Sequence, residues 1–202
     1  MTTLDLHLAS ASPRRSDILT SLGLRFSVAA TDVDETPVPG ESVAEMVLRL
    51  AALKADAGRA TAAANLPVVG ADTAVTLDDR VFGKPESREH ALDMLSALSG
   101  RVHRVLTGVA VYAAGNVATA LSATEVEFRD IDPDEADLYW QSGEPAGKAG
   151  AYAIQGLGGV FVRSLHGSYS GVVGLPVYET AALLRAAGVA LPPNPGAVSE
   201  HD

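Results

Sequence analysis

From Leu66 to Leu77 the chain reads LPVVGADTAVTL, a run that is apolar at almost every position except Asp72 and two threonines. A short run of this kind without alternation is typical of a β-strand that is covered on both faces. Apolar residues at helical spacing precede it between residues 42 and 65, which indicates a helix. The run therefore predicts a buried strand in an α/β protein.

The segments on either side of this run alternate between strand-like and helix-like patterns. Gly115-Asn116 joins two long β-rich runs and predicts a hairpin. Strands interspersed with helices indicate an α/β fold with a mixed sheet. Residues 1–190 are expected to form one domain, and 191–202, which hold three of the eleven prolines, a loose tail. The expected strands cover 3–9, a short segment from 27, 66–77, 80–82, 101–113 and 117–128, and the expected helices cover 13–22, 42–65, 87–99, 132–140 and 176–187.

The composition excludes several classes of function. The 202 residues are 47% hydrophobic, which is enough for a packed core, and their net charge of −10 argues against broad binding to nucleic acid or anionic membranes. The absence of cysteine excludes disulfides, cysteine metal sites and thiol nucleophiles, and it fits a reducing compartment. Residues 1–15 lack the pattern of an export signal, and the uncharged run 105–124 is interpreted as a hairpin rather than a membrane span.

The first candidate site is the segment Ser10-Ala11-Ser12-Pro13-Arg14-Arg15, where a strand leads directly into a helix. Ser12 suits the N-cap and Pro13 the first helical position, and the free N–H groups of a helix start favour anions. Arg14 and Arg15 lie in the first turn, where a cation is mildly unfavourable unless a polyphosphate is bound. The alternative is a capped surface helix with two solvated arginines.

Three charged residues are further candidates. Asp72 interrupts an apolar strand, where a carboxylate is costly unless it is paired, hydrogen-bonded or bound to a metal. Lys54 lies on the inward face of the expected helix, and Lys84 is a point charge in the rigid Gly83-Lys84-Pro85 loop. The alternatives are an aspartate bonded to a loop backbone, a lysine that extends to solvent, and an ordinary turn lysine.

The glycine-rich segment from 143 to 156 can bring backbone close to a ligand, and the amide of Gln155 can recognise the edge of a base. Gly156-Leu157-Gly158-Gly159 lacks the third glycine of a dinucleotide-binding loop, so that interpretation is rejected. No pair of histidines has metal-ligand spacing, and no nucleophile elbow is present.

These motifs, taken in order, resemble the Maf family of nucleoside triphosphate pyrophosphatases from Leu8 to Pro176. The matching blocks are Leu8 to Arg15, Lys54-Ala55, Gly70-Ala71-Asp72-Thr73, Gly83-Lys84-Pro85, Leu98-Ser99-Gly100 with His103 and Thr107-Gly108, Gly143-Glu144-Pro145, Lys148 to Gly156, Gly167-Ser168-Tyr169 and Val172 to Pro176.

The resemblance implies an elongated mixed sheet flanked by helices, with two lobes and a deep cleft, as in inosine-triphosphate pyrophosphatases. It also implies a divalent metal, a cytoplasmic location, a homodimer, and the branch of the family that acts on dTTP and UTP. Gly147 departs from the pattern, since many members carry Asp there. By this match Arg14, Thr73 and Gln155 select the base, Asp72 accepts a proton, and Ser10, Arg15, Glu35, Lys54 and Lys84 occupy other cleft positions.

The resulting hypothesis is hydrolysis of a nucleoside triphosphate to the monophosphate and pyrophosphate. In this hypothesis Arg14, Arg15, Lys54 and Lys84 surround the triphosphate. Glu35 and Asp72 hold Mg²⁺ or Mn²⁺, and Mg²⁺ binds one or two carboxylates together with phosphate oxygens and water. Two alternatives are a nucleotide-binding regulator of division or DNA uptake with incidental hydrolysis, and a hydrolase of modified nucleotides.

Overall fold

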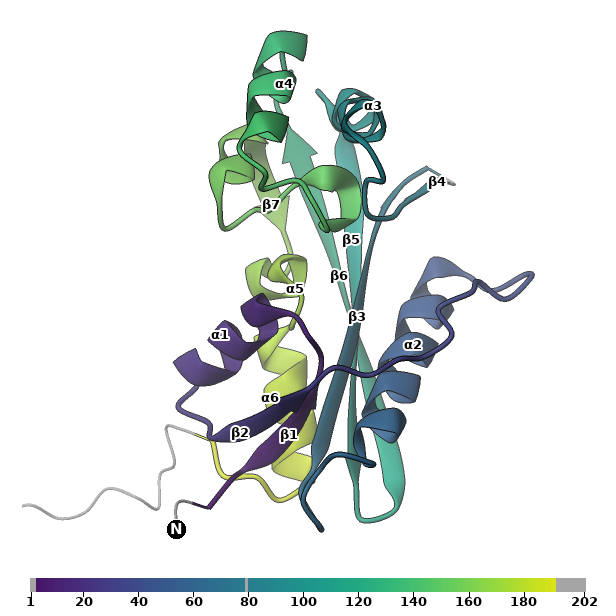
Figure 1. Ribbon diagram of the computed structural model, residues 1–202, viewed down its shortest axis with the longest axis vertical. Helices are drawn as coiled ribbons and strands as arrows, with labels where there is room; N and C mark the ends of the chain where they lie inside the picture. Colours follow the sequence, from purple (N-terminus) through teal and green to yellow (C-terminus); the bar gives the residue numbers. More distant parts are fainter. Residues whose placement is uncertain (1–2, 79, 192–202) are drawn as a thin grey trace, which may run out of the picture.

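The computed structural model describes residues 3–78 and 80–191 and shows a mixed sheet that runs the length of the molecule (Figure 1). The strand order is β2-β1-β3-β5-β6-β7, and β4 pairs with β3. β1 is parallel to both of its neighbours, and the other pairs are antiparallel, which confirms the expected mixed α/β class. The strands are β1 (Leu6–Ala9), β2 (Phe26–Ala29), β3 (Val68–Leu77), β4 (Arg80–Phe82), β5 (Val102–Ala113), β6 (Asn116–Phe128) and β7 (Val162–His166).

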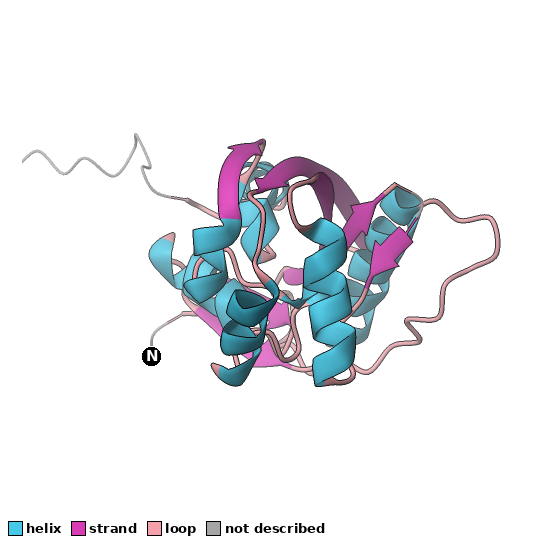
Figure 2. Cartoon of the chain, turned by 90° about the horizontal axis from the view of Figure 1, so that it is seen from above, coloured by secondary structure: helices cyan, strands magenta, loops and turns pink. Residues whose placement is uncertain are grey.

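Helices flank this sheet, and a view along the longest axis shows them around the strands (Figure 2). α2 packs on one face of β3 and β5, while α1, α5 and α6 lie on the opposite side (Figure 1). None of the helices in the described part of the chain has the length and apolarity to cross a bilayer. The helices are α1 (Pro13–Ser21), α2 (Val43–Gly58), α3 (Arg88–Leu98), α4 (Pro133–Gln141), α5 (Tyr169–Val173) and α6 (Val177–Ala186), with 3₁₀ turns η1 (Ala149–Ala151) and η2 (Leu157–Phe161).

Two main hydrophobic clusters lie at the two ends of the long strands. One gathers Phe82, Leu95, Phe128 and Phe161 with residues of α3 and α4. The other gathers side chains of β1, α1 and α6, together with parts of β3 and β5. Because β3 and β5 contribute to both clusters, they connect the two ends of the molecule across its middle.

Two glycines on adjacent strands bring α2 unusually close to the sheet. Gly70 of β3 and Gly108 of β5 face α2, and a Cβ built on Gly70 falls 2.5 Å from the backbone N of Ala55. A Cβ built on Gly108 falls 2.6 Å from the carbonyl carbon of Val47. Only glycine allows this approach, which places the α2 side chains directly over the centre of β3.

The expected elements are present, although several boundaries differ and one turn is shifted, and α5 is a helix that the sequence did not predict. α2 ends at Gly58 rather than near Asn65, and Ser12 stands at the N-cap of α1 without a side-chain capping bond. The hairpin between β5 and β6 forms, but its turn residues are Ala114 and Gly115, both with positive φ. Of the expected tail, Leu191 is buried in the core, and 192–202 lie outside the described residues.

His103 is one of several polar residues buried in the protein. His103 of β5 is 1% exposed, and its Nε2 lies 2.9 Å from the hydroxyl of Tyr152. The ring also packs edge-on against Phe128, with centroids 4.7 Å apart. Burial lowers the pKa of His103 to about 4, because the charged imidazolium would lose its hydration. His103 is therefore neutral in the folded protein at neutral pH.

This buried histidine predicts acid-sensitive stability. The unfolded chain takes up a proton at His103 near its ordinary pKa of 6.5, whereas the folded chain does so only near 4. The contribution of His103 to the free energy of unfolding is therefore fully present above pH 6.5. It falls by about 3 kcal/mol as the pH is lowered toward 4. Urea unfolding at pH 7 and pH 4 should show that loss in the wild type beyond the loss in His103→Gln. Equal losses in the two proteins would contradict the prediction.

Candidate active site

A gap along one edge of β3 creates the candidate site. β1 pairs with β3 at Val68 and Val69, and β4 pairs with it from Val75 to Leu77. Between these points, residues 70–74 pair with β5 on one side and have no strand partner on the other among residues 3–78 and 80–191. A cavity of about 750 Å³ opens at this gap. Its walls therefore come from the loops after β1 and β4 and from elements on both faces of the sheet.

The open edge explains how neighbouring residues of β3 serve one cavity. Successive side chains of a strand point to opposite faces, so Asp72 lies on the α2 face with Gly70, and Thr73 lies on the α5 face. Both reach the cavity because no strand of the described residues covers this edge. The structure brings every candidate residue of the sequence to this one cavity: Ser10, Arg14, Arg15, Glu35, Lys54, Asp72, Thr73, Lys84 and Gln155.

Arg15 is held rigidly at the start of α1. Its Nη1 donates to Ser10 Oγ at 3.0 Å, and its Nε donates to the carbonyl of Gly174 at 2.8 Å. Ser10 Oγ also accepts from the backbone N–H of Ser12 at 3.2 Å. Burial lowers the pKa of Arg15 to about 10, so it keeps its positive charge at neutral pH.

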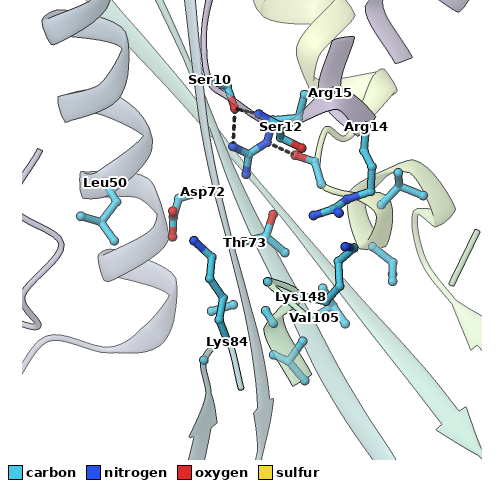
Figure 3. A pocket seen from close by; sticks show the side chains of 18 of the residues that line it. Ser10, Ser12, Arg14, Arg15, Leu50, Asp72, Thr73, Lys84, Val105 and Lys148 are labelled. Atoms are coloured by element: carbon cyan, nitrogen blue, oxygen red, sulfur yellow. Dashed lines mark hydrogen bonds between the residues drawn. The ribbon is translucent and has the colours of Figure 1, made fainter. Parts of the chain in front are cut away.

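Further cations face the same space. Figure 3 shows Arg14 and Lys148 converging, while Lys84 points toward Asp72. Burial lowers the pKa of Arg14, and burial together with the nearby Arg14 charge lowers the pKa of Lys148. Among the described residues none of these three cations, nor Arg15, forms an ion pair. In residues 3–78 and 80–191, four cations that form no ion pair thus surround the cavity of an acidic protein, which favours a polyanionic ligand.

Lys54 connects the two candidate carboxylates. Its Nζ lies 2.7 Å from Asp72 Oδ1 and 2.6 Å from Glu35 Oε1. The side chains of Lys54 and Asp72 are only 12% and 14% exposed, whereas that of Glu35 is 55% exposed. The hydrogen bond from Lys54 lowers the pKa of Glu35 below its ordinary value. The sequence alternative of an Asp72 side chain bonded only to loop backbone is not what the structure shows.

The donor set at this point fits a divalent cation. Glu35 and Asp72 converge on a single positive charge, and Mg²⁺ takes one or two carboxylates together with phosphate oxygens and water. No group of three His, Asp or Glu side chains with metal-binding geometry occurs in the part of the chain described. A metal held here would therefore need oxygens from a bound phosphate to complete its shell.

Glu144 supports the loop that carries Gln155. Its carboxylate accepts from the backbone N–H groups of Leu157 and Gly158, each at 2.9 Å, and from the hydroxyl of Tyr139 at 2.7 Å. Three hydrogen bonds to one carboxylate fix the turn that follows Gln155. Glu144 belongs to one of the matching sequence blocks but has no role that the sequence alone reveals, because only the folded loop shows its partners.

Two other residues of the candidate segment 143–156 received no role from the sequence. Lys148 lines the cavity, and its Nζ donates to the carbonyl of Ala146 at 3.2 Å. The neighbouring Gly147 has a φ of +69°, with open space where a side chain would stand. Lys148 therefore has no carboxylate partner from this position.

The family of the chain follows from sequence comparison. A family model described as Maf-like protein matches residues 5–187, which is most of the chain. The chain belongs to the Maf-like family. The resemblance inferred from the motifs is thereby confirmed.

Several curated relatives of this Maf-like chain have the name dTTP/UTP pyrophosphatase. The protein from Methylococcus capsulatus is 50% identical over 186 residues, covering 92% of each chain. The protein from Saccharophagus degradans is 51% identical, covering 90% of this chain and 88% of its own. The protein from Yersinia pestis bv. Antiqua is 52% identical, covering 89% and 91%.

A solved structure titled nucleoside-triphosphatase / dITP/XTP pyrophosphatase, from Mycobacterium abscessus, also matches this Maf-like chain. It is 16% identical and covers 61% of this chain and 72% of its own, with a TM-score of 0.36.

Proposed function

We propose that this Maf-like protein is a nucleoside triphosphate pyrophosphatase that hydrolyses dTTP and UTP to the monophosphate and pyrophosphate. The observation that carries the proposal is the cavity itself, where four cations that pair with no carboxylate of the described residues lie beside the Lys54-linked carboxylates of Glu35 and Asp72. The choice of dTTP and UTP rests on the names of the relatives. A cytoplasmic location and a homodimer belong to the same proposal and rest on the family resemblance.

The cations perform the binding step. A triphosphate carries about four negative charges near neutral pH, and its attraction to cations is stronger in a partly buried cavity than in water. Arg15, anchored to Ser10 and Gly174, provides a fixed charge, while Arg14, Lys84 and Lys148 approach from other walls. They neutralise the phosphates and the charge that develops on the leaving pyrophosphate.

Asp72 performs the proton transfer. Lys54 holds Oδ1, and Oδ2 has no hydrogen-bond partner among the described residues, so it is available to a water molecule. Asp72 accepts one proton of that water while the oxygen of the water bonds to the α-phosphorus. The bond between the α-phosphorus and the oxygen that bridges to the β-phosphorus breaks, and pyrophosphate leaves. A divalent cation held by Glu35 and Asp72 would supply charge stabilisation and a lower pKa for water.

The proposal predicts a specific substrate and product pattern. In a panel of canonical and modified nucleoside triphosphates with Mg²⁺ or Mn²⁺, kcat/KM should be highest for dTTP and UTP. The products should be the monophosphate and pyrophosphate, separated by ion-exchange chromatography. A diphosphate and orthophosphate would overturn the cleavage position. Nucleotide binding without turnover would instead indicate a regulator of cell division, and a modified nucleotide far ahead of dTTP and UTP would indicate removal of modified nucleotides.

A further inference from the structure

Two threonine hydroxyls at the cavity wall form a short series of hydrogen bonds in which each donor can be assigned. Thr73 of β3 and Thr107 of β5 stand directly opposite each other in the antiparallel ladder, and their Oγ1 atoms are 2.9 Å apart. Thr107 is fully buried, and its Oγ1 also lies 2.8 Å from the carbonyl oxygen of Gly171 in α5. Thr73 lines the cavity, whereas Thr107 does not.

Counting protons settles which hydroxyl donates to which. A threonine hydroxyl has one proton and two lone pairs, and a carbonyl oxygen only accepts. Thr107 therefore donates its hydroxyl proton to the carbonyl oxygen of Gly171. In the hydrogen bond between the two hydroxyls, the donor must then be Thr73. The Thr73 oxygen is then left with lone pairs only, and no other hydrogen bond to it comes from the residues that the structure describes.

We propose that Thr107 is a positioning residue that holds the Thr73 hydroxyl as a hydrogen-bond acceptor toward the cavity, so that the group of the nucleotide placed there must be a donor. A phosphate oxygen, which only accepts, is a poor partner for such a hydroxyl.

This inference rests on the proposed function, in which the ligand is a pyrimidine nucleotide. Uracil and thymine linked to a sugar through N1 have one ring donor, N3–H, whereas cytosine presents an acceptor at N3. The sugar hydroxyls also donate, but they are the same in UTP and CTP, so the donor that can distinguish the bases is N3–H of uracil or thymine. We place that N3–H against Thr73, where cytosine in the same pose would set two acceptors against each other. An unsatisfied acceptor pair in a partly buried site costs affinity, so Thr107 contributes to base selection although it lies outside the cavity.

Equilibrium binding separates this effect from a loss of structure. The probes are the α,β-methylene analogues of UTP and CTP, which cannot be cleaved at the bond in question, measured by calorimetry at equal salt and metal concentrations. The wild type should prefer the uracil analogue. Thr107→Val keeps the shape of the side chain but frees the Thr73 proton to turn toward the cavity, and the preference should fall by about tenfold.

Three further variants complete the test. Thr107→Ser keeps the hydroxyl and should retain the preference for the uracil analogue. In a protein that already carries Thr73→Val, adding Thr107→Val should not change that preference further. Thr180→Val is the matched control, because Thr180 is also fully buried and its hydroxyl has no partner within the described part of the chain. An analogue methylated at N3 of uracil should bind the wild type as poorly as the cytosine analogue.

The outcomes distinguish this inference from the function on which it rests. A uracil preference that Thr107→Val leaves unchanged, or that Thr107→Ser abolishes equally, overturns the inference and leaves the proposed function standing. A wild type that binds neither analogue overturns the proposed function and the inference with it. A weakening of both analogues by the same factor would show that Thr107 acts only through packing.

Discussion

Replacing Asp72 by asparagine should lower kcat for pyrophosphate release by about 10²–10⁴-fold, the usual contribution of a positioned general base. The change is close to isosteric, and the amide oxygen can still accept the 2.7 Å hydrogen bond from Lys54. What is lost is the negative charge and the ability to take a proton from water. The cations that bind the phosphates are untouched, so the affinity for nucleotide should change far less than kcat.

The measurement is steady-state pyrophosphate release by the purified Asp72→Asn variant, together with nucleotide binding and far-ultraviolet circular dichroism. Glu41→Gln is the control, because Glu41 pairs with Arg49 at 2.6 Å and does not line the cavity. It should retain the wild-type kcat. A folded Asp72→Asn variant with a rate within a few-fold of the wild type would remove Asp72 from the chemistry.

Gly108→Ala should destabilise the protein by about 3 kcal/mol, at the upper end of the usual cost of overpacking. The added methyl group meets the backbone of α2 at Val47, and a backbone segment in the middle of a helix cannot move aside as the end of a flexible side chain can. Gly70→Ala meets the same helix at Ala51 and Ala55 and should have a similar effect. Both changes push α2 away from β3.

Urea unfolding of the two variants measures this cost. Gly83→Ala is the control, since a Cβ at Gly83 meets nothing within 4 Å and its φ is not positive. Its free energy of unfolding should stay within about 0.5 kcal/mol of the wild type. If Gly108→Ala were equally harmless, the close approach of α2 to the sheet would not be a requirement of the fold.

The same approach of α2 matters for the site. Lys54 belongs to α2, and its ammonium reaches Asp72 on β3 and Glu35 in the loop between β2 and α2. A helix displaced by a methyl group would carry Lys54 away from both carboxylates. Residual activity of a folded Gly108→Ala variant should therefore fall together with its stability.

Much of the fold was predictable because local periodicity records which faces of an element are buried. The apolar run of β3 and the helical spacing of α2 are visible within a dozen residues each, and their existence and order were predicted. The element ends were less predictable, because fraying and short pairing segments depend on neighbours. β1, for example, begins only at Leu6, where pairing with β2 begins.

The sequence by itself determined most of the elements and their order, the inventory of charged side chains, and the motifs that resemble the Maf family. Only the tertiary structure decided that β1 and β4 leave the middle of one edge of β3 open, that Lys54 joins Glu35 to Asp72, and that Thr107 directs the proton of Thr73. The physical reason is the distance along the chain over which a sequence pattern is informative. Spacing along a chain reports on neighbours a few residues away, whereas the contact between Arg15 and Gly174 joins residues 159 positions apart and exists only once the sheet has formed.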